Sequence, residues 1–429
     1  MILRVSSSAE RGAIAVLAAA SFAFLAFFSV RDALAVYFAG EETLAGFSRA
    51  TRLEPGNPEN WFGLGRYWQY NLENSDLEAA TAAYRKALSL NPQAADVWLD
   101  LAASYEALGK VREAADAFAN AQNVYPLSAQ VAWSYGNFLL RQGDLGGAFT
   151  EMHRAVAADP RRGGEAFSRC IRVEPDIDKI LDRVIPPSRD IYLEIIATLA
   201  DGNQVTDALR VWDRLVLLRP QLQLRSASQL VEALRRSQSP QEASRIWSQA
   251  AALSGYANLA DPAGSVLWDG GFESGETGLT YTWNFSPNAH GVQIGLQSQE
   301  KHSGSRALRV TFDGRSNLSF HDVCHLVPVD PATSYRFSAW VRTRDLSTDQ
   351  GVHFILGAVA GGAPLITKDA LGSEDWNQFI ADWTSPAGAR EAMVCLARLQ
   401  SDQPDNKIRG TLWVDDVALV PVASESAIP

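Results

Sequence analysis

The sequence predicts a multidomain chain with three parts: an N-terminal transmembrane helix, an all-α solenoid of helical repeats and an all-β sandwich. Three observations lead to this prediction. Residues 12–30 form an uncharged apolar run. A short motif that ends in proline recurs at a fixed spacing up to residue 160, and short runs of alternating apolar and polar residues follow residue 264. The length of 429 residues is also more than one domain usually needs.

Composition and charge narrow the class of protein. Hydrophobic residues make up 47% of the chain and charged residues 20%, which is the balance of an ordinary globular protein. The net charge is −11 at pH 7. Because binding to a phosphate backbone needs a concentrated basic face, this acidic balance argues against nucleic acid as the main partner.

The apolar run at the N-terminus predicts a membrane anchor. Residues 12–30 approach the ~20 residues that cross ~30 Å of hydrocarbon as a helix. Arg4 and Arg11 precede the run, so the positive-inside rule predicts a cytoplasmic N-terminus, a single pass through the inner (plasma) membrane and a periplasmic bulk. A cleaved signal peptide is the alternative, since ALA at 33–35 fits a cleavage site. The run exceeds the ~7–15 apolar residues of a usual signal, which favours the anchor.

The middle of the chain contains an internal repeat. The motifs ALSLNP, AQNVYP and AVAADP end at Pro92, Pro126 and Pro160, at 34-residue intervals. A fixed period of this length is typical of a helix-turn-helix solenoid, in which small residues let antiparallel helices approach and proline ends the second helix. Three extra residues are expected near QYNLENSD in the first unit. The clearest units are 58–92, 95–126 and 129–160.

The recurring positions of these units resemble the tetratricopeptide repeat. Leu101, Ala102, Tyr105 and Gly109 of one unit have counterparts at matching offsets in the next. The resemblance implies about five or six helical pairs over 42–255, irregular after Pro160, with a concave groove that binds a protein partner. For each groove position, a solvated or packing role is the alternative. By the family's offsets the groove positions are Phe62, Arg66, Gln69, Asp96, Leu99, Glu106, Trp133 and Asn137.

After residue 264 the periodicity changes to two. SRALRVTF, TSYRFSAWVRT and TLWVDDVALV are among the alternating or β-rich runs, and Gly, Pro, Asp and Ser separate them. Such short strands predict an antiparallel sandwich or jelly roll. The predicted order is a cytoplasmic N-terminus (1–11), an anchor (12–30), repeats (42–255), a linker (256–264), the sandwich (265–421) and a tail (422–429).

The order of motifs in the sandwich resembles carbohydrate-binding modules of the jelly-roll, galactose-binding-like kind that accompany cellulases and xylanases. The motifs are DGGFESG, Trp283, HSGSRALRVTF, YRFSAWVRT, Trp376 and LWVDDVAL. The resemblance implies binding of a polysaccharide. The outward-facing pair Trp340 and Arg342, together with Trp283, are the expected ligand contacts, and core packing is the alternative for each tryptophan.

The same resemblance implies a structural calcium ion where the first and last strands meet. Calcium takes about six to eight oxygen ligands. The implied ligands are the carboxylates of Glu273 and Asp416, backbone carbonyls near Gly271 and around Lys301–His302, and Glu300 as an extra ligand. Asp415 is the alternative to Asp416, because strict alternation points only one of them to the site. A metal-free turn in which Glu273 caps backbone amides is the other alternative.

The three cysteines, Cys170, Cys324 and Cys395, are far apart and form no CxxC motif, which argues against a zinc site. Cys324 and Cys395 both lie in strand-like sequence. Two buried free thiols are the favoured interpretation, and a disulfide is the alternative for an extracytoplasmic domain.

The sequence contains no GxSxG, P-loop, HExxH or strand-associated GxGxxG motif, so we do not expect an enzyme; hydrolysis of glycosyl bonds would be the reaction if there were one. The predicted function is a membrane-anchored extracytoplasmic adaptor. Its repeats would bind a protein and its sandwich a polysaccharide, in assembly or export of a cell-envelope or extracellular polysaccharide. The alternatives are a pure protein–protein scaffold and a non-catalytic module of a glycoside hydrolase system.

Overall fold

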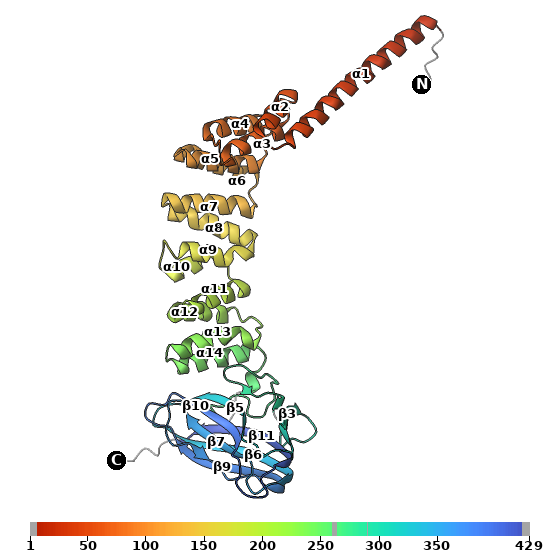
Figure 1. Cartoon of the computed structure of the whole chain (residues 1–429). Coiled ribbons are helices and arrows are strands. Elements are labelled where there is room, and N and C mark those ends of the chain that lie inside the picture. The colour runs from red at the N-terminus through yellow and green to blue at the C-terminus, as the bar shows by residue number, and fades with distance from the viewer. Residues whose placement is uncertain (1–6, 260–263, 290, 423–429) are drawn as a thin grey trace. The chain divides into compact units, whose positions relative to one another are not determined.

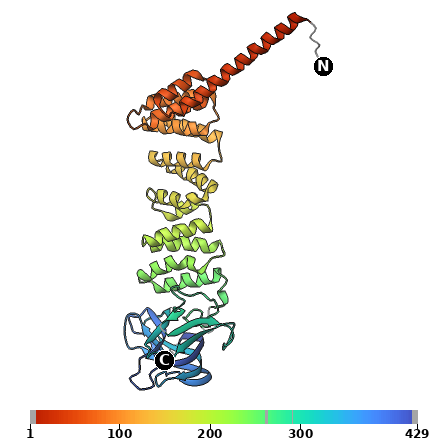
Figure 2. The same cartoon turned by 45° about the vertical axis from the view of Figure 1, so that its right-hand side comes forward.

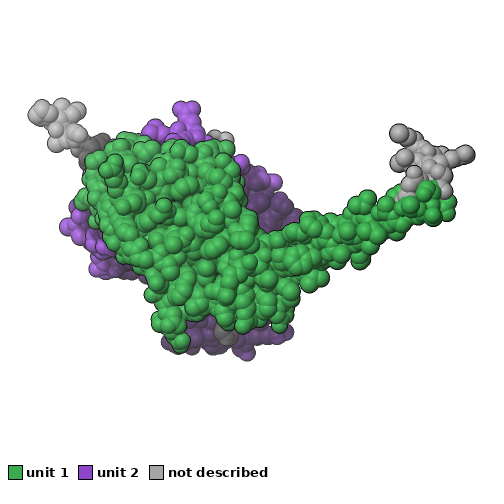
Figure 3. Space-filling view, turned by 90° about the horizontal axis from the view of Figure 1, so that it is seen from above, with its two compact units in different colours: residues 1–186 green, residues 187–429 purple. Residues whose placement is uncertain are grey.

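The computed structural model describes residues 7–259, 264–289 and 291–422. The chain divides into two compact units, residues 1–186 and 187–429 (Figure 3). Parts of four predicted segments lie outside the described residues: the start of the N-terminal segment 1–11, positions 260–263 of the linker 256–264, residue 290 of the sandwich 265–421 and nearly all of the tail 422–429.

The first unit begins with the long apolar helix α1 (Ser8–Ala39) (Figure 1). Its stretch Arg11–Ala39 is long and apolar enough to cross a membrane, and a signal sequence near an N-terminus would have the same properties. The last turns of α1 pack against α2 (Leu44–Leu53), where Ala35 and Ala50 are fully buried. The end of α1 and α2 therefore form a helical pair before the first complete repeat.

Three helical pairs follow, and they correspond to the three units expected from the 34-residue spacing (Figures 1 and 2). A β-carbon at Gly65 would lie 2.5 Å from the Tyr84 ring, so the small residue is needed where the helices approach most closely. The loop from Asn71 to Asp76 is three residues longer than the loop from Leu108 to Lys110, which confirms the expected insertion. The pairs are α3 (Pro58–Tyr70) with α4 (Leu77–Leu90), α5 (Ala95–Ala107) with α6 (Val111–Val124), and α7 (Ala129–Gln142) with α8 (Leu145–Ala158).

The helical pattern becomes irregular after Pro160, as expected. The first unit ends in a 3-10 turn (Pro160–Arg162) and two short helices, α9 (Gly163–Cys170) and α10 (Ile177–Arg183). The second unit opens with four further helices. They are α11 (Arg189–Asp201), α12 (Val205–Leu217), α13 (Ser228–Arg236) and α14 (Pro240–Leu253).

The rest of the second unit is an antiparallel β-sandwich. Within the described residues, one sheet has the strand order β1-β5-β10-β7-β8 and the other has the order β2-β3-β4-β11-β6-β9. We call them the five-stranded and the six-stranded sheet. The five-stranded sheet contains β1 (Trp283–Asn284), β5 (Phe320–Pro328), β10 (Glu391–Arg398), β7 (His353–Ala358) and β8 (Leu365–Ile366). The six-stranded sheet contains β2 (Asn288–Ala289), β3 (Val292–Gln297), β4 (Ala307–Asp313), β11 (Arg409–Pro421), β6 (Ser334–Ser347) and β9 (Gly372–Thr384).

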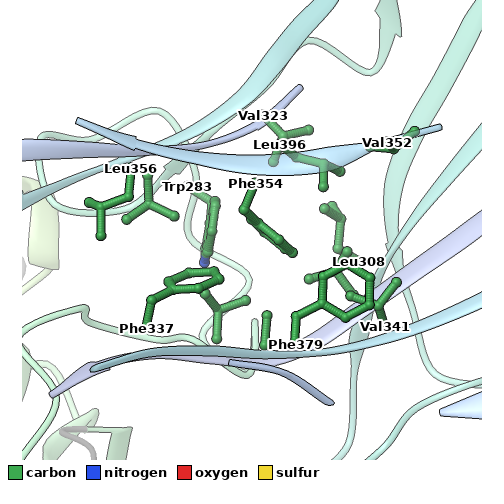
Figure 4. Close-up of a cluster of buried hydrophobic side chains, with 14 of the residues drawn as sticks. Trp283, Leu308, Val323, Phe337, Val341, Val352, Phe354, Leu356, Phe379 and Leu396 are labelled. Atoms are coloured by element: carbon green, nitrogen blue, oxygen red, sulfur yellow. The ribbon is translucent and has the colours of Figure 1, made fainter. Parts of the chain in front are cut away.

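The core of the sandwich lies between the two sheets. Figure 4 shows Phe337 and Phe379 from the six-stranded sheet facing Phe354 and Leu356 from the five-stranded sheet. Alternate residues of β6, such as Tyr335 and Phe337, are buried, as the period of two predicts. Outward-facing residues of the same strand are partly or fully exposed.

Helices α13 and α14 pack directly on the sandwich within the second unit. The Trp247 ring of α14 lies edge-on to Trp268 and to Tyr281, with centroid distances of 5.4 and 6.0 Å. The Arg235 guanidinium forms two hydrogen bonds to the Glu391 carboxylate, at 2.5 and 3.0 Å. The last helical pair and the sandwich therefore share one buried interface.

Cys324 of β5 and Cys395 of β10 form a disulfide bond. The two residues lie directly opposite each other in the strand pairing, with Cα atoms 4.1 Å apart. The favoured interpretation as two free thiols is therefore wrong, because it did not include the strand register that brings the residues together. Cys170 is buried in α9 and bonds to no described cysteine.

Candidate functional site

The first helices of consecutive repeats line a groove in the first unit. The groove has a volume of about 600 Å³ and takes its walls from α3, α5 and α7, with Arg169 of α9 at one end. The repeat places these positions on one surface because each pair repeats the orientation of the one before. Seven expected groove residues line it: Phe62, Arg66, Asp96, Leu99, Glu106, Trp133 and Asn137.

Gln69 is not among the lining residues of the groove. Its Oε1 instead accepts a hydrogen bond from the Tyr84 hydroxyl at 2.5 Å, so it stabilises a packing contact between α3 and α4. The groove also contains residues that the offsets did not select. Asp100 and Ser134 both line it and are 34 residues apart, so the repeat period relates these two positions.

Four charged residues of the groove form two ion pairs with one another in this structure. Arg141 binds the Glu106 carboxylate through two hydrogen bonds of 2.7 and 2.8 Å. Burial raises the pKa of Asp100, whose carboxylate also lies 3.7 Å from Arg66. This pairing gives the groove no strong net charge, so apolar and hydrogen-bonding side chains would decide which peptide fits.

Trp133 is the aromatic centre of the groove. The guanidinium groups of Arg162 and Arg169 each lie 5.1 Å from its ring centroid, and Arg169 also donates a hydrogen bond to Asn137 at 2.8 Å. A ring held between two cations is fixed in orientation. The groove is therefore a preformed surface whose main side chains are already held in place.

A second candidate site is the carboxylate cluster, which we define as Glu273, Asp415 and Asp416 around Gly271. A β-carbon at Gly271 would lie 3.6 Å from Asp416 Oδ1, 3.6 Å from Glu273 Cγ and 3.8 Å from Asp415 Oδ1. The start and the end of the sandwich meet here, since Val417 N–H donates to the Gly270 carbonyl at 3.0 Å.

Asp415 and Asp416 both point towards Gly271. Strict alternation of side chains along a strand would allow only one of them to do so. The residue Asp416 has a φ of +47°, and the pairing of β11 with β6 is irregular between Asp415 and Ala418. Such a bulge breaks the period of two and lets neighbouring side chains reach the same side. The expectation that only one aspartate points to this site is therefore wrong.

Protein donors already bind the carboxylates of the cluster. The Glu273 carboxylate accepts hydrogen bonds from Ser305 N–H at 2.6 Å and Arg306 N–H at 3.0 Å, and from the Ser305 hydroxyl. Asp415 accepts from the His302 and Ser303 amides at 2.8 and 3.1 Å. Glu273 thus caps backbone amides, as in the metal-free alternative.

The electrostatics of the cluster reflect its burial. Burial raises the pKa of Asp415 to about 6, and the neighbouring Asp416 charge acts in the same direction. Burial also raises the pKa of Asp269, which lies beside the cluster. For Glu273, burial is outweighed by hydrogen bonds from Ser305 and Arg306, and its pKa lies below the ordinary value.

One of the expected calcium ligands, Glu300, is engaged elsewhere. The Glu300 carboxylate forms an ion pair with Arg342 at 2.7 Å. The His302 ring bonds Asp416 through Nδ1 at 2.7 Å and stacks on Trp340. The oxygens that fit a calcium ion by their chemistry are those of Glu273, Asp415 and Asp416.

The expected sugar contacts do not form a free surface together. Trp283 is 2% exposed, stacks on Phe272 at 5.0 Å and donates from Nε1 to the Asp269 carbonyl at 3.2 Å. It is a core residue, so its expected contact with a ligand is wrong. Trp340 lies on the outer face of the sheet as expected, but His302 covers one face of its ring at a centroid distance of 3.9 Å.

A third candidate site lies elsewhere on the outer face of the six-stranded sheet. We call it the β3–β4 hollow; its volume is about 220 Å³. It lies beside Trp413 of β11, whose register partner on β4 is Arg309. None of the expected site residues lies here, although the alternation in VQIGLQ and ALRVTF turns polar side chains outward and could have located the site. Its polar lining consists of Gln293, Gln297, Arg309 and Thr311, with Gly295 between the glutamines.

Two family models match the helical part of the chain. One, described as a tetratricopeptide repeat, matches residues 99–162, and the other, described as a TPR repeat, matches residues 72–109. Residues 72–162 therefore carry tetratricopeptide repeats, which confirms the resemblance drawn from the 34-residue spacing. A comparison with curated proteins returns no match.

Several solved structures resemble parts of the chain at low identity. YrrB, a TPR protein with an unusual peptide-binding site, is 16% identical, covers 51% of this chain and 97% of its own, and has a TM-score of 0.26. PilF of Pseudomonas aeruginosa is 17% identical, covers 54% and 96%, and has a TM-score of 0.27. The CBM22-1-GH10 modules of xylanase 10B from Clostridium thermocellum, complexed with xylohexaose, are 13% identical over 39% of this chain and 29% of theirs, at 0.26. TM-scores this low assign no ligand to this chain.

Proposed function

We propose that this chain is a membrane-anchored adaptor that binds a segment of a partner protein in the groove of its repeats and a polysaccharide on its sandwich. Tetratricopeptide repeats are protein-interaction scaffolds, which supports the first part. The observation that carries the proposal is the groove itself, in which side chains of three consecutive first helices meet around about 600 Å³.

Two features support an extracytoplasmic setting. The helix α1 has the length and composition of a membrane anchor. The Cys324–Cys395 disulfide would persist in the periplasm, because the cytosol keeps most thiols reduced. A β-sandwich whose motifs resemble those of carbohydrate-binding modules, held outside the membrane in the same chain as a protein-binding groove, suits assembly or export of an envelope polysaccharide.

The groove proposal predicts the effect of filling the groove. Leu99→Arg places a charged, longer side chain on the groove wall, so binding of the partner should fall by about tenfold or more. Leu90→Arg is the matched control, because Leu90 is exposed on α4 and does not line the groove. The measurement is the amount of partner that copurifies with the full-length chain from its own membranes. Equal recovery with both variants would contradict the proposal.

We also propose a structural calcium ion at the carboxylate cluster. A cation there would offset the repulsion between Asp415 and Asp416. Chelation with EGTA should then lower the melting temperature of the full-length chain by several degrees, since a ligand at a hundred times its Kd stabilises by about 2.7 kcal/mol. Glu273→Ala should remove this response.

The matched control for calcium is Glu276→Ala, a half-buried glutamate in the same loop. This variant should keep the full response to EGTA. If the melting temperature of the unmodified chain is the same with calcium and with EGTA, the cluster is a metal-free cap held by its amide donors.

A further inference from the structure

We propose that the β3–β4 hollow binds the carboxylate of an acidic sugar, so that the polysaccharide recognised by the sandwich contains hexuronic acid. This inference rests on the proposed binding of a polysaccharide and names the class of that polysaccharide. It is carried by an arginine without an acidic partner, an open floor and strand hydroxyls beside it on one sheet face.

Arg309 differs from three other arginines of this sheet face, Arg336, Arg342 and Arg344. Arg336 is paired with Asp382 at 2.9 Å, Arg342 with Glu300 at 2.7 Å, and Arg344 with Glu300 at 3.4 Å. Among the described residues, no carboxylate forms an ion pair with Arg309. A guanidinium in this situation is available to a carboxylate from outside, and its planar fork suits two parallel hydrogen bonds.

The arginine is positioned by its neighbours in the sheet. Arg309 Nε donates to Thr311 Oγ1 at 3.2 Å, which leaves its terminal nitrogens free of that contact. The Thr311 and Thr411 hydroxyls lie 3.4 Å apart on adjacent strands and can exchange hydrogen bonds with sugar hydroxyls. Each of these groups belongs to a strand, so the sheet holds them in place.

The hollow has room for a ring beside this guanidinium. A β-carbon at Gly295 would meet nothing within 4 Å, so the floor between the two glutamines is open. The residues that line the hollow include no acid, and an incoming carboxylate would meet amides, a hydroxyl and a guanidinium. This composition complements an anionic sugar.

Trp413 adjoins the hollow. It is 5% exposed, and its Nε1 has no hydrogen-bond partner among the described residues. It lies on the same face as Arg309, which is its register partner, and Arg344 lies 5.2 Å over its ring. The N–H itself is enclosed, so Trp413 is a packed ring next to Arg309 and does not present a donor to the hollow.

The overall charge of the chain makes the test selective. At a net charge of −11, an acidic polymer is repelled by most of the surface, so its binding would report a local basic site. The test is isothermal titration of the full-length chain in detergent with a galacturonic acid oligomer and with a neutral xylose oligomer of equal length. We expect the acidic oligomer to bind at least about tenfold more tightly, because hydrogen bonds to charged groups are the stronger ones.

Variants locate the site. Arg309→Gln should reduce affinity for the acidic oligomer about tenfold and leave affinity for the neutral oligomer unchanged. Arg336→Gln removes a cation from the same sheet face that is already paired with Asp382, and it should leave both affinities unchanged. Because Arg309 is exposed, its replacement should not change the melting temperature, which confirms that the variant is folded.

The outcomes separate the inference from the proposed function. Equal binding of both oligomers, unaffected by Arg309→Gln, would overturn the acidic-sugar inference and leave polysaccharide binding in place. Binding of a sulfated neutral glycan as tight as that of the uronic acid oligomer would overturn the assignment of a carboxylate. Binding of no glycan would overturn both the inference and the proposed role of the sandwich.

Discussion

Replacement of Trp283 by alanine is expected to destabilise the sandwich by about 3–5 kcal/mol, the usual cost of removing a large buried aromatic side chain. The indole is 2% exposed and lies between Phe272, at a centroid distance of 5.0 Å, and His325, at 5.1 Å. It also donates a hydrogen bond to the Asp269 carbonyl. Its loss would leave a cavity where the first segment of the sandwich packs, and the Asp269 carbonyl would keep only the hydrogen bond from Phe272 N–H at 3.1 Å.

The measurement is the free energy of unfolding of the full-length chain in denaturant, followed by near-ultraviolet circular dichroism. Trp340→Ala is the matched control, since Trp340 is half-buried on the outer face of the sheet and contacts His302. The free energy of unfolding should fall less than half as much in Trp340→Ala as in Trp283→Ala. A Trp283→Ala protein with an unchanged unfolding midpoint would contradict the core assignment.

Loss of the Cys324–Cys395 disulfide has the second largest expected effect, a destabilisation of about 2–4 kcal/mol. The bond joins residues 71 positions apart, and without it the unfolded chain gains the freedom of that loop. The free energy of unfolding in denaturant is compared between the oxidised chain and the Cys324→Ala/Cys395→Ala double variant. The double variant avoids effects of a reducing agent on other groups.

Alkylation followed by mass spectrometry verifies the bond. After denaturation without reduction, one cysteine should be labelled, and that cysteine should be Cys170, which is buried in the native chain. After reduction, all three cysteines should be labelled. Three labels without reduction would show that the thiols are free in the native protein.

The repeats could be predicted from sequence because their contacts are local. Each helical pair buries its small residues against its neighbour, so the 34-residue spacing of Pro92, Pro126 and Pro160 reports the structure directly. Seven of the eight positions that the offsets of the repeat family selected lined the groove as expected. Gln69 did not, because its hydrogen bond to Tyr84 depends on side-chain geometry that an offset does not contain.

The sandwich was harder to predict, because its contacts join distant segments. Alternation correctly placed the buried face of β6, since that pattern lies within one strand. It could not place Trp283, whose burial depends on how the segment before β1 folds over the core. The bulge at Asp416 and the register that joins Cys324 to Cys395 also depend on neighbouring strands.

The stretch from Val266 to Gly275 shows both sides of this comparison. Its position beside the last strand was expected, and the hydrogen bonds from Val266 N–H to the Leu419 carbonyl and from Val417 N–H to the Gly270 carbonyl establish it. That the helices α13 and α14 share an interface with the same domain was not expected. The hydrophobic pattern of a helix shows that one face is buried, but not which element covers it.

Site-specific photo-crosslinking tests the central claim, that the groove binds a partner protein, most directly. A photoreactive amino acid at position 99 faces the groove, and the same amino acid at position 90 does not. In the full-length chain in its own membrane, position 99 is expected to give one defined crosslinked adduct with a partner protein. Position 90 is expected not to give this adduct. The same adduct from both positions, or no adduct from position 99, would contradict the claim.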